Sequence, residues 1–394
     1  MFNLAITYAV GDGVEQDKAK AEHWGQEALG SGYAPAYLPA SYPDVWWQIM
    51  QQTKLRAPAH LAELHRVVRN LLSKGHGVER SGTVSHYTDV DAVLSMLGHD
   101  GNEPGVLRMY NISYANDPQE GMALVKYAED KHKGHPLVGF FSGLSGSKTG
   151  ENMPFFGEHV YFVSFSEAKD RLDLWRFYGR DGAGACLVIP KEAFADPSQA
   201  HQIAGSFMDY RTKLRQGKLS DIPSKERQTQ DRGRDPDPPL ILWRVLYSPK
   251  AKDTALDSLC APLENIAKVK SACSSIQNAD KAIDEAVQVI LAELLYLHKN
   301  TEYEREGELR VMAVRYLTSE NVSGDRPAIQ VDGRGRLYLE TPRILFKTRG
   351  HEIVIGPKVA EYFEARLHLL YLLRKQKIPE TYVTVSPSRV PYQP

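Results

Sequence analysis

Two glutamates spaced two residues apart, Glu306 and Glu308, have the residue type and spacing in this sequence that best suit catalysis. They lie in the segment TEYEREGELRVMAVRY, residues 301–316, whose second half alternates apolar and polar side chains as a β-strand requires. That alternation predicts that both carboxylates project from one face of the strand, roughly 7 Å apart. Carboxylates placed in this way can hold a ribose hydroxyl, stabilise a developing positive charge or accept a proton.

The remaining residues of this predicted strand allow a second interpretation. Leu309, Val311 and Ala313 should face a core, and Arg310 should share the face of the two glutamates. On a solvated strand face, Glu308 would simply form an ion pair with Arg310 or another neighbour. The string E-x-E-x-R alone therefore leaves a catalytic pair and a structural pair open.

A histidine provides the second candidate, at the start of the segment TVSHYTDVDAVLSML. A short strand carrying His86 and Tyr87 should end where Thr88 and Asp91 form a start like a capping box for a helix. Free backbone N–H groups and the positive end of a helix dipole at such a junction suit a phosphate. A histidine at a strand end can equally be structural.

Aromatic and turn residues make up the other candidates. The segment LRMYNISYANDPQEG contains Tyr114 and, in a predicted turn, Asn116. A later helix carries Trp175, Phe177 and Tyr178, which could stack on a flat ring or fill the core. The sequence favours the core for these aromatic side chains.

The composition excludes several classes of protein. The 394 residues include 42% hydrophobic and 25% charged side chains, as in ordinary globular proteins. A net charge of −1 offers no general attraction to nucleic acid or anionic lipid, although nucleic acid is not excluded as a partner. The three cysteines have no C-x-x-C spacing, which argues against a disulfide framework and against a zinc ribbon. They indicate a reducing compartment. No membrane span, signal peptide or metal-ligand cluster is predicted.

Two domains are expected, with residues 1–75 mainly helical and residues 82–394 forming an α+β domain. A mobile insertion rich in charge and proline is predicted at 217–239, and a Gly- and Ser-rich flexible loop at 140–157. Helical spacing predicts one helical stretch at about 259–298 and another at 359–375. Further strands are predicted at LILWRVLYS, RLYLE, ILFKT, HEIVIG and YVTVS.

The N-terminal segment resembles a Sel-like repeat, a relative of the tetratricopeptide repeat. The likeness lies in the core Tyr-x-x-Gly-x-Gly-Val-x-x-Asp and in the later Ala, Trp and Gly of residues 3–38. One such unit cannot bury its own apolar face, so it should dock on the downstream domain or belong to a longer array. Paired-helix repeats bind proteins, which implies recruitment of a target protein.

The rest of the chain resembles a bacterial family catalogued as a domain of unknown function. The resemblance rests on blocks that occur in the same order across about residues 84–390: HYTDVDAVLSML, YANDPQEG, FSEAKDRLDLWRFYGRDGAGACLVI, EREGELRVM and EIVIGPK. That family is similar in pattern to the His-Tyr-Glu branch of ADP-ribosyltransferases. This implies an ADP-ribosyltransferase-like split antiparallel sheet with flanking helices.

The resemblance also implies roles for the candidate residues. His86 would hold a ribose of NAD, either Tyr114 or Tyr178 would stack on nicotinamide, and Glu308 would be the catalytic glutamate. Glu306 would orient or deprotonate the acceptor. Tyr87, Thr88, Asn116 and Trp175 complete the expected NAD-binding set, and no metal is called for. The pattern departs from the branch because it has no clear helix with paired tyrosines.

The resemblance thus implies an NAD-dependent mono-ADP-ribosyltransferase that modifies a macromolecular target, such as a toxin, an effector or a phage-defence protein. NAD hydrolysis, with water as acceptor, is one alternative. A non-catalytic protein-binding adaptor is another, which ion pairs between the glutamates and arginines would favour. We expect a cytoplasmic protein, or one delivered to another cell by a route that the sequence does not reveal.

Overall fold

The computed structural model describes most of the chain from residue 43 onward. The described stretches are 43–54, 56–99, 101, 104–115, 117, 120–141, 160–197, 240–315 and 329–392, together with a few single positions before residue 43. The resemblance to a Sel-like repeat at 3–38 and the predicted insertion at 217–239 therefore lie outside the described residues, apart from those single positions. Most of the predicted loop at 140–157 also lies outside them.

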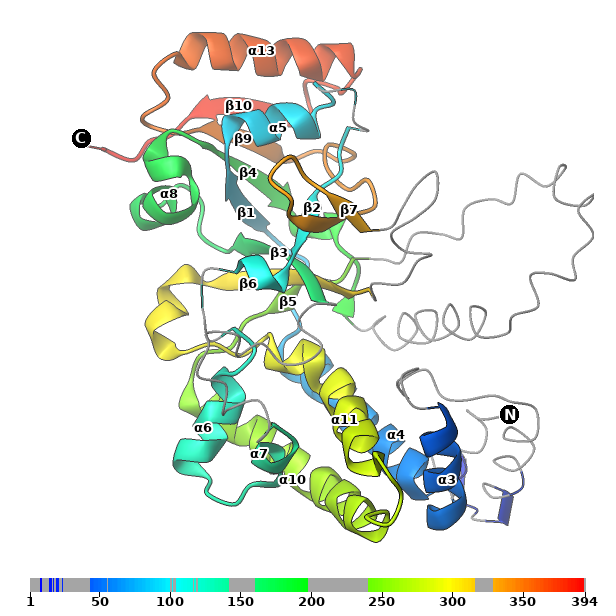
Figure 1. The fold of residues 1–394 in the computed structure, drawn as a ribbon. Helices are drawn as coiled ribbons and strands as arrows, with labels where there is room; N and C mark the ends of the chain where they lie inside the picture. The colour runs from blue at the N-terminus through cyan, green and yellow to red at the C-terminus, as the bar shows by residue number, and fades with distance from the viewer. Residues whose placement is uncertain are drawn as a thin grey trace, which may run out of the picture.

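Nine α-helices and ten β-strands are described in these stretches (Figure 1). The helices are α3 (Pro43–Thr53), α4 (Arg56–Gly75), α5 (Val90–Met96), α6 (Ala123–Lys131), α7 (Pro136–Phe141), α8 (Leu172–Tyr178), α10 (Pro249–Ala272), α11 (Ala279–Leu295) and α13 (Tyr362–Lys375). The strands are β1 (Thr83–Thr88), β2 (Arg108–Asn111), β3 (Val160–Ser166), β4 (Ala185–Pro190), β5 (Trp243–Arg244), β6 (Glu308–Val314), β7 (Ile329–Val331), β8 (Leu337–Glu340), β9 (His351–Ile355) and β10 (Val383–Pro387).

The strands form one large sheet in the order β10-β9-β4-β1-β3-β2-β8-β7, with β6 on β3 and β5 on β6. Every pair is antiparallel except β9 with β10, which is parallel. An α+β fold with a mainly antiparallel sheet is therefore confirmed.

The sheet forks at β3. Strand β6 pairs with β3 along its whole length on one edge, from Val160 to Ser166. On the other edge, β1 pairs with β3 only at Ser166, and β2 pairs with β3 only at Tyr161 and Phe162. Strands β1 and β2 therefore diverge along the same edge of β3.

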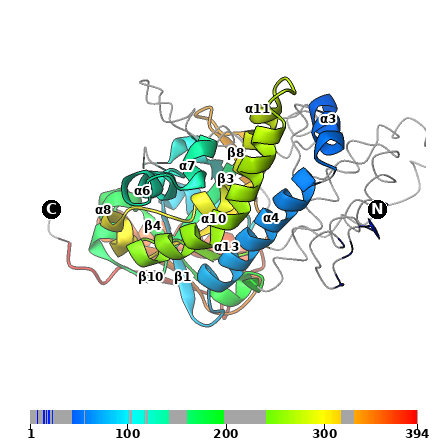
Figure 2. The same cartoon turned by 90° about the horizontal axis from the view of Figure 1, so that it is seen from below.

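A layer of helices packs against one end of the sheet, below it in Figure 1 and in front of it when viewed from below in Figure 2. This layer contains α3, α4, α6, α7, α10 and α11, whose apolar stripes share one core. Leu64 and Val68 of α4 are buried there with Leu256 and Leu263 of α10. The helix at 56–75 thus shares its core with the chain after residue 82 and does not form a separate hydrophobic unit.

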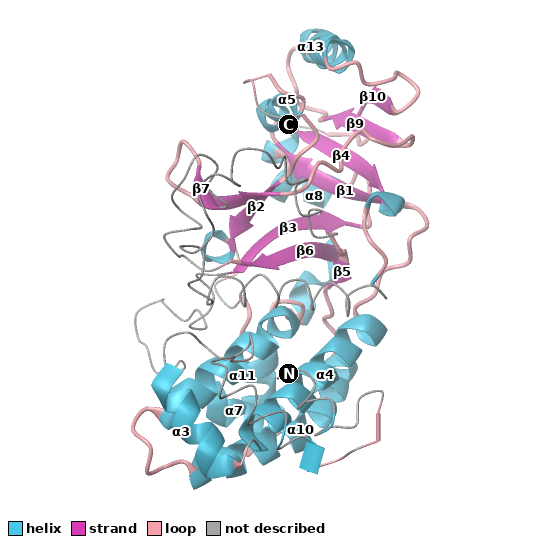
Figure 3. Ribbon diagram, turned by 90° about the vertical axis from the view of Figure 1, so that its right-hand side faces the viewer, coloured by secondary structure: helices cyan, strands magenta, loops and turns pink. Residues whose placement is uncertain are grey.

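A second core lies on the face of the sheet that points away from the helical layer. Helices α5 and α13 cover it, and Figure 3 shows them on the far side of the sheet from the helical layer. Leu309 and Val311 of β6 point into this core, as the alternation predicts, and Ala313 packs against it. A small third core lies under α8, where Tyr87, Trp175 and Val354 are buried together.

Several predicted elements have different bounds in the structure. The helical stretch predicted at 259–298 is two helices, α10 and α11. The segment ILFKT forms turns, and LILWRVLYS contributes only the two-residue strand β5 and isolated bridges. The expected capping box at Thr88 is absent, because the N-cap of α5 is Asp89 and its side chain caps no N–H group.

The shared core predicts that α4 contributes to the stability of the whole described fold. Val68→Ala should lower the free energy of unfolding by about 1–3 kcal/mol, because Val68 is 1% exposed and its truncation leaves a cavity. Val331→Ala is the matched control, since that side chain is 61% exposed and should change the free energy by less than about 0.5 kcal/mol. Chemical denaturation followed by circular dichroism measures both. Equal effects of the two substitutions would contradict the shared core.

Candidate active site

Strand β6 positions the central carboxylate of the site. Gly307 has φ +54°, a left-handed conformation that turns the chain from the 3-10 helix Thr301–Glu306 into β6. Glu308, the first strand residue, and Arg310 then point to the same face, toward the helical layer. Glu306 is not part of the strand, so the prediction that both glutamates project from one strand face is wrong.

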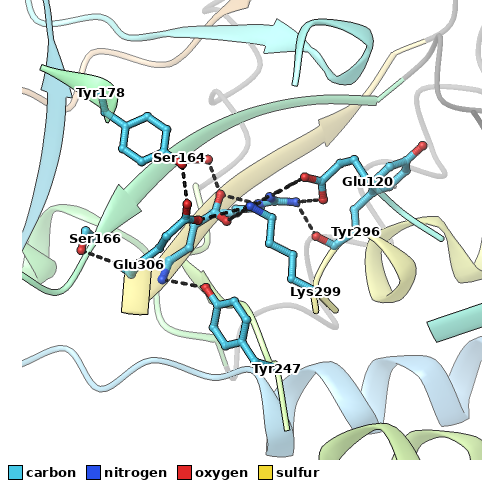
Figure 4. A network of polar contacts seen from close by, with 10 residues as sticks. Glu120, Ser164, Ser166, Tyr178, Tyr247, Tyr296, Lys299 and Glu306 are labelled. Carbon is cyan, nitrogen blue, oxygen red and sulfur yellow. Dashed lines mark hydrogen bonds and ion pairs between the residues drawn. The ribbon is translucent and has the colours of Figure 1, made fainter. Parts of the chain in front are cut away.

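Arg310 lies at the centre of a buried network of charges, although its position in a strand gives no sign of this. Figure 4 labels Glu120, Lys299 and Glu306 of this network. Its guanidinium forms a bidentate pair with Glu308, at 2.7 and 3.0 Å, and a second bidentate pair with Glu120, at 2.6 and 3.0 Å. The carbonyl of Tyr296 accepts a further hydrogen bond from Arg310 at 2.6 Å, and the ring of Phe162 lies 4.7 Å from the guanidinium carbon. Arg310 is 1% exposed, so these contacts replace the water that the charge would otherwise require.

Lys299 links the two glutamates that the sequence singles out. Its ammonium lies 2.7 Å from Glu308, 3.4 Å from Glu306 and 3.8 Å from Glu120. The hydroxyl of Ser164 donates to Glu308 at 2.5 Å. We define the site network as these five charged residues, Glu120, Lys299, Glu306, Glu308 and Arg310.

The site network holds its central groups ionised. Burial opposes the charge on Glu308, but the charges of Arg310 and Lys299 outweigh it and lower the pKa of Glu308 to about 2. Burial likewise opposes the charge on Lys299, and Glu308 outweighs it, so the pKa of Lys299 is raised. Three carboxylates face two cations, which leaves one excess negative charge.

The site network reaches solvent at Glu306. Its side chain is 20% exposed, whereas those of Glu308 and Lys299 are 6% and 8% exposed. The hydroxyl of Tyr178, at the end of α8, donates to Glu306 at 2.5 Å, and the Tyr178 side chain is itself exposed. Burial and the Glu306 carboxylate raise the pKa of Tyr178, so this phenol stays protonated as a donor. Glu306 is therefore the carboxylate of the network that a substrate can reach.

His86 approaches the same part of β3 from the opposite face. Ser85, Ser166 and Glu308 form one cross-strand row, so Glu308 shares the face of Ser85, and His86 points to the other face. The His86 Nδ1 lies 2.8 Å from the carbonyl oxygen of Ser164, within the fork, and its ring is 5.7 Å from that of Phe165. Burial lowers the pKa of His86, which favours the neutral ring. Ser164 thus lies between the two residues: its carbonyl oxygen contacts His86 on one face, and its hydroxyl donates to Glu308 on the other.

Two of the expected NAD-binding residues are buried in the core under α8. Trp175 is 0% exposed, its ring meets that of Tyr87 at 5.1 Å, and its Nε1 donates to Asp170. Tyr87 is also buried, and its hydroxyl bonds the carbonyl of Ala168. Packing on all sides leaves no ring face for a ligand, so neither residue can stack on nicotinamide as expected.

The other expected residues lie apart from the site network. Thr88 ends β1 beside Ala185 of β4. Tyr114 is exposed, and its hydroxyl accepts a hydrogen bond from the backbone N–H of Leu337, beside β8. Asn116 lies outside the described residues. Of the two tyrosines considered as stackers, the structure brings only Tyr178 to the glutamates.

Sequence reasoning missed Glu120 and Lys299. Glu120 belongs to the block YANDPQEG, and the following Gly121 has φ +78° and packs so closely on Tyr296 that a Cβ atom would lie 2.4 Å from the ring. Lys299 lies in the segment between α11 and the 3-10 helix. Nothing in the local pattern marks either residue, but Glu120, Tyr178 and the E-x-E-x-R string come from three separate blocks of the family resemblance.

A substrate would therefore meet a carboxylate, a phenol donor and an excess negative charge held by fixed partners. Such groups can stabilise a positive charge or accept a proton. Within the described residues, no group of three or more His, Cys, Asp or Glu side chains is placed to hold a metal ion, and no helix has the length and apolar character that crossing a membrane requires.

Comparison with known proteins adds no relative. The chain matches no protein-family model, no curated protein and no solved structure.

The buried guanidinium predicts a large cost for removing its charge. Arg310→Met should lower the free energy of unfolding by about 3–5 kcal/mol, because Glu120 and Glu308 would lose their main cation while remaining buried. The exposed Arg334 provides the control, since Arg334→Met should cost less than about 0.5 kcal/mol. Urea denaturation at neutral pH measures both values, and similar costs would contradict the central role of Arg310.

The low pKa of Glu308 predicts a specific acid sensitivity. Its pKa falls from an ordinary 4.5 to about 2 on folding, so its ionisation stabilises the fold above about pH 4.5, and this contribution is lost as the pH falls toward 2. Glu308→Gln should therefore be less stable than the wild type at pH 7, and the difference should shrink as the pH falls below 4.5. Denaturation curves at several pH values measure it. A difference that does not depend on pH would rule out the ion pairs as its source.

Proposed function

We propose that this chain is an NAD-dependent mono-ADP-ribosyltransferase that modifies a macromolecule. The observation that supports it best is the accessible Glu306 carboxylate, which Tyr178 and Lys299 hold at the open end of a network with an excess negative charge. The site network and Tyr178 together draw on three blocks through which the sequence resembles a family similar to His-Tyr-Glu transferases. The forked, mainly antiparallel sheet agrees with the split sheet that this resemblance implies.

The proposed reaction uses Glu306 twice. When the bond between nicotinamide and ribose breaks, nicotinamide leaves with the bonding electrons and positive charge develops on the ribose. The negative end of the site network stabilises that charge. The acceptor then forms a bond to the same ribose carbon, and its proton passes to Glu306.

The roles of the two glutamates differ from those that the resemblance implies. Glu308 has Arg310, Lys299 and Ser164 as partners and almost no exposure, so in this proposal it positions Lys299 and, through it, Glu306. His86 likewise acts from the far face of β3, where it holds the fork through Ser164. Glu306 and Tyr178 are the proposed groups that contact NAD.

The acceptor follows from the resemblance of the N-terminal segment to a Sel-like repeat. Such repeats bind proteins, so we propose a protein target, while nucleic acid remains an alternative acceptor. A toxin, an effector or a phage-defence protein would have this activity, acting in the cytoplasm of its own cell or after delivery to another. Nicotinamide release without a labelled macromolecule would instead identify an NAD glycohydrolase.

A non-catalytic adaptor is the second candidate, and one observation favours it. Glu308 is ion-paired to both Arg310 and Lys299 inside the protein, as expected of a glutamate that stabilises the fold. In that case the site network would only connect the helical layer to the sheet, and the repeats would carry the function.

Glu306→Gln separates the two candidates. The amide keeps the shape of the side chain but cannot stabilise positive charge or accept a proton, so nicotinamide release should fall by at least about 100-fold. Glu304→Gln is the matched control, because Glu304 is an exposed glutamate two residues away in the same 3-10 helix and should retain wild-type release. Incubation with NAD labelled on the adenylate, followed by chromatography and gel autoradiography, reports cleavage and transfer together.

An adaptor would give a different pattern. The wild type would release no nicotinamide above background, and both glutamine variants would bind protein partners as the wild type does. Wild-type release that survives Glu306→Gln would contradict the proposed role of Glu306.

A further inference from the structure

Helix α13 carries a row of exposed apolar side chains on its outer face. Phe363, Leu367 and Tyr371 are 77%, 64% and 60% exposed, whereas few large apolar side chains among the described residues are exposed. Their spacing of four residues places them along one stripe of the helix. We call these three residues the α13 stripe.

The opposite face of α13 already has its partners. Leu369, Leu372 and Leu373 are buried in the core that also contains Leu309 and Val311 of β6. The helix packs there beside α5 and β10, at the top of the molecule in Figure 1. None of the described residues covers the α13 stripe. A contiguous exposed apolar row on a folded protein commonly marks an interaction site.

The charges along α13 are unevenly distributed. Glu361 and Glu364 lie at its start, and Arg374 and Lys375 lie in its last turn. All four side chains are exposed. Arg366 lies between the two ends, and Arg374 is paired with Glu380 of its own chain at 2.8 Å. The start of the helix is therefore acidic and its end basic through Lys375, so the two ends are complementary in charge to those of an inverted copy.

We propose that α13 is the interface of a homodimer, in which the α13 stripes of two copies of this chain pack in antiparallel orientation about a two-fold axis near Leu367. Leu367 then meets Leu367 of the second copy, and Phe363 meets the second copy's Tyr371. At 1.5 Å per residue, Lys375 of the second copy lies about 4.5 Å along the axis beyond Tyr362, the first residue of α13, on the side where Glu361 precedes the helix. The acidic start of each helix faces the basic end of the other, as a two-fold interface requires.

The proposed interface leaves the site network free. Helix α13 covers the sheet face onto which Leu309 points, whereas Glu308 and Arg310 point to the other face. Dimerisation would therefore hold two sites at a distance from one another, and the inference does not depend on the proposed reaction.

The oligomeric state in solution tests the inference. Size-exclusion chromatography with light scattering should give the wild type twice the 44.2 kDa mass of one chain at micromolar concentrations. Leu367→Asp should give a monomer with unchanged circular dichroism, because it puts two carboxylates at the centre of the apolar contact. The control Val331→Asp alters an equally exposed apolar residue on β7 and should remain a dimer.

Charge reversal gives an independent readout of the antiparallel arrangement. Lys375→Glu should weaken dimerisation by at least about tenfold, and adding Glu361→Lys to the same chain should restore it, because each pair is then opposite in sign again. A monomeric wild type would overturn the proposal, including one that binds lipid vesicles through α13. A dimer that survives Leu367→Asp would overturn it as well.

Discussion

The ionised guanidinium of Arg310, buried between the sheet and the helical layer, is the constraint on which the site depends. A charge in this position requires fixed carboxylates, and Glu120 and Glu308 supply them from segments 190 and 2 residues away. Through these contacts and the carbonyl of Tyr296, Arg310 connects the loop before α6, the start of β6 and the end of α11. Lys299 then extends the network outward to Glu306.

The two neighbouring glutamates differ in their partners and in their exposure to solvent. Glu308 has Arg310, Lys299 and Ser164 as partners, and the charges of Arg310 and Lys299 lower its pKa. Glu306 has fewer partners, some exposure and a phenol that stays protonated beside it. Left-handed Gly307 separates them, because it ends the 3-10 helix before the strand begins and directs Glu306 away from the strand face. Preorganised partners of this kind are what catalysis of charge separation requires.

Strand-like segments predicted β8, β9 and β10, and sequence periodicity predicted β6 and α13 because each of these two buries one regular face. It placed Glu308 and Arg310 together for the same reason. It could not predict that Glu306 leaves the strand, since that depends on one backbone conformation at Gly307. Nor could it find Glu120 or Lys299, because their roles arise from contacts between segments far apart in the chain. The resemblance implies that His86 and Glu308 serve one ligand, and only the strand register shows that they point to opposite faces of the sheet.

A crystal structure with a non-hydrolysable NAD analogue would show which carboxylate contacts the ligand. We expect the nicotinamide ribose within hydrogen-bond distance of Glu306 and Tyr178, with the pairs of Arg310 to Glu308 and Glu120 unchanged. An analogue bound away from Glu306, or one that breaks the pairs of Arg310 to reach Glu308, would contradict this expectation.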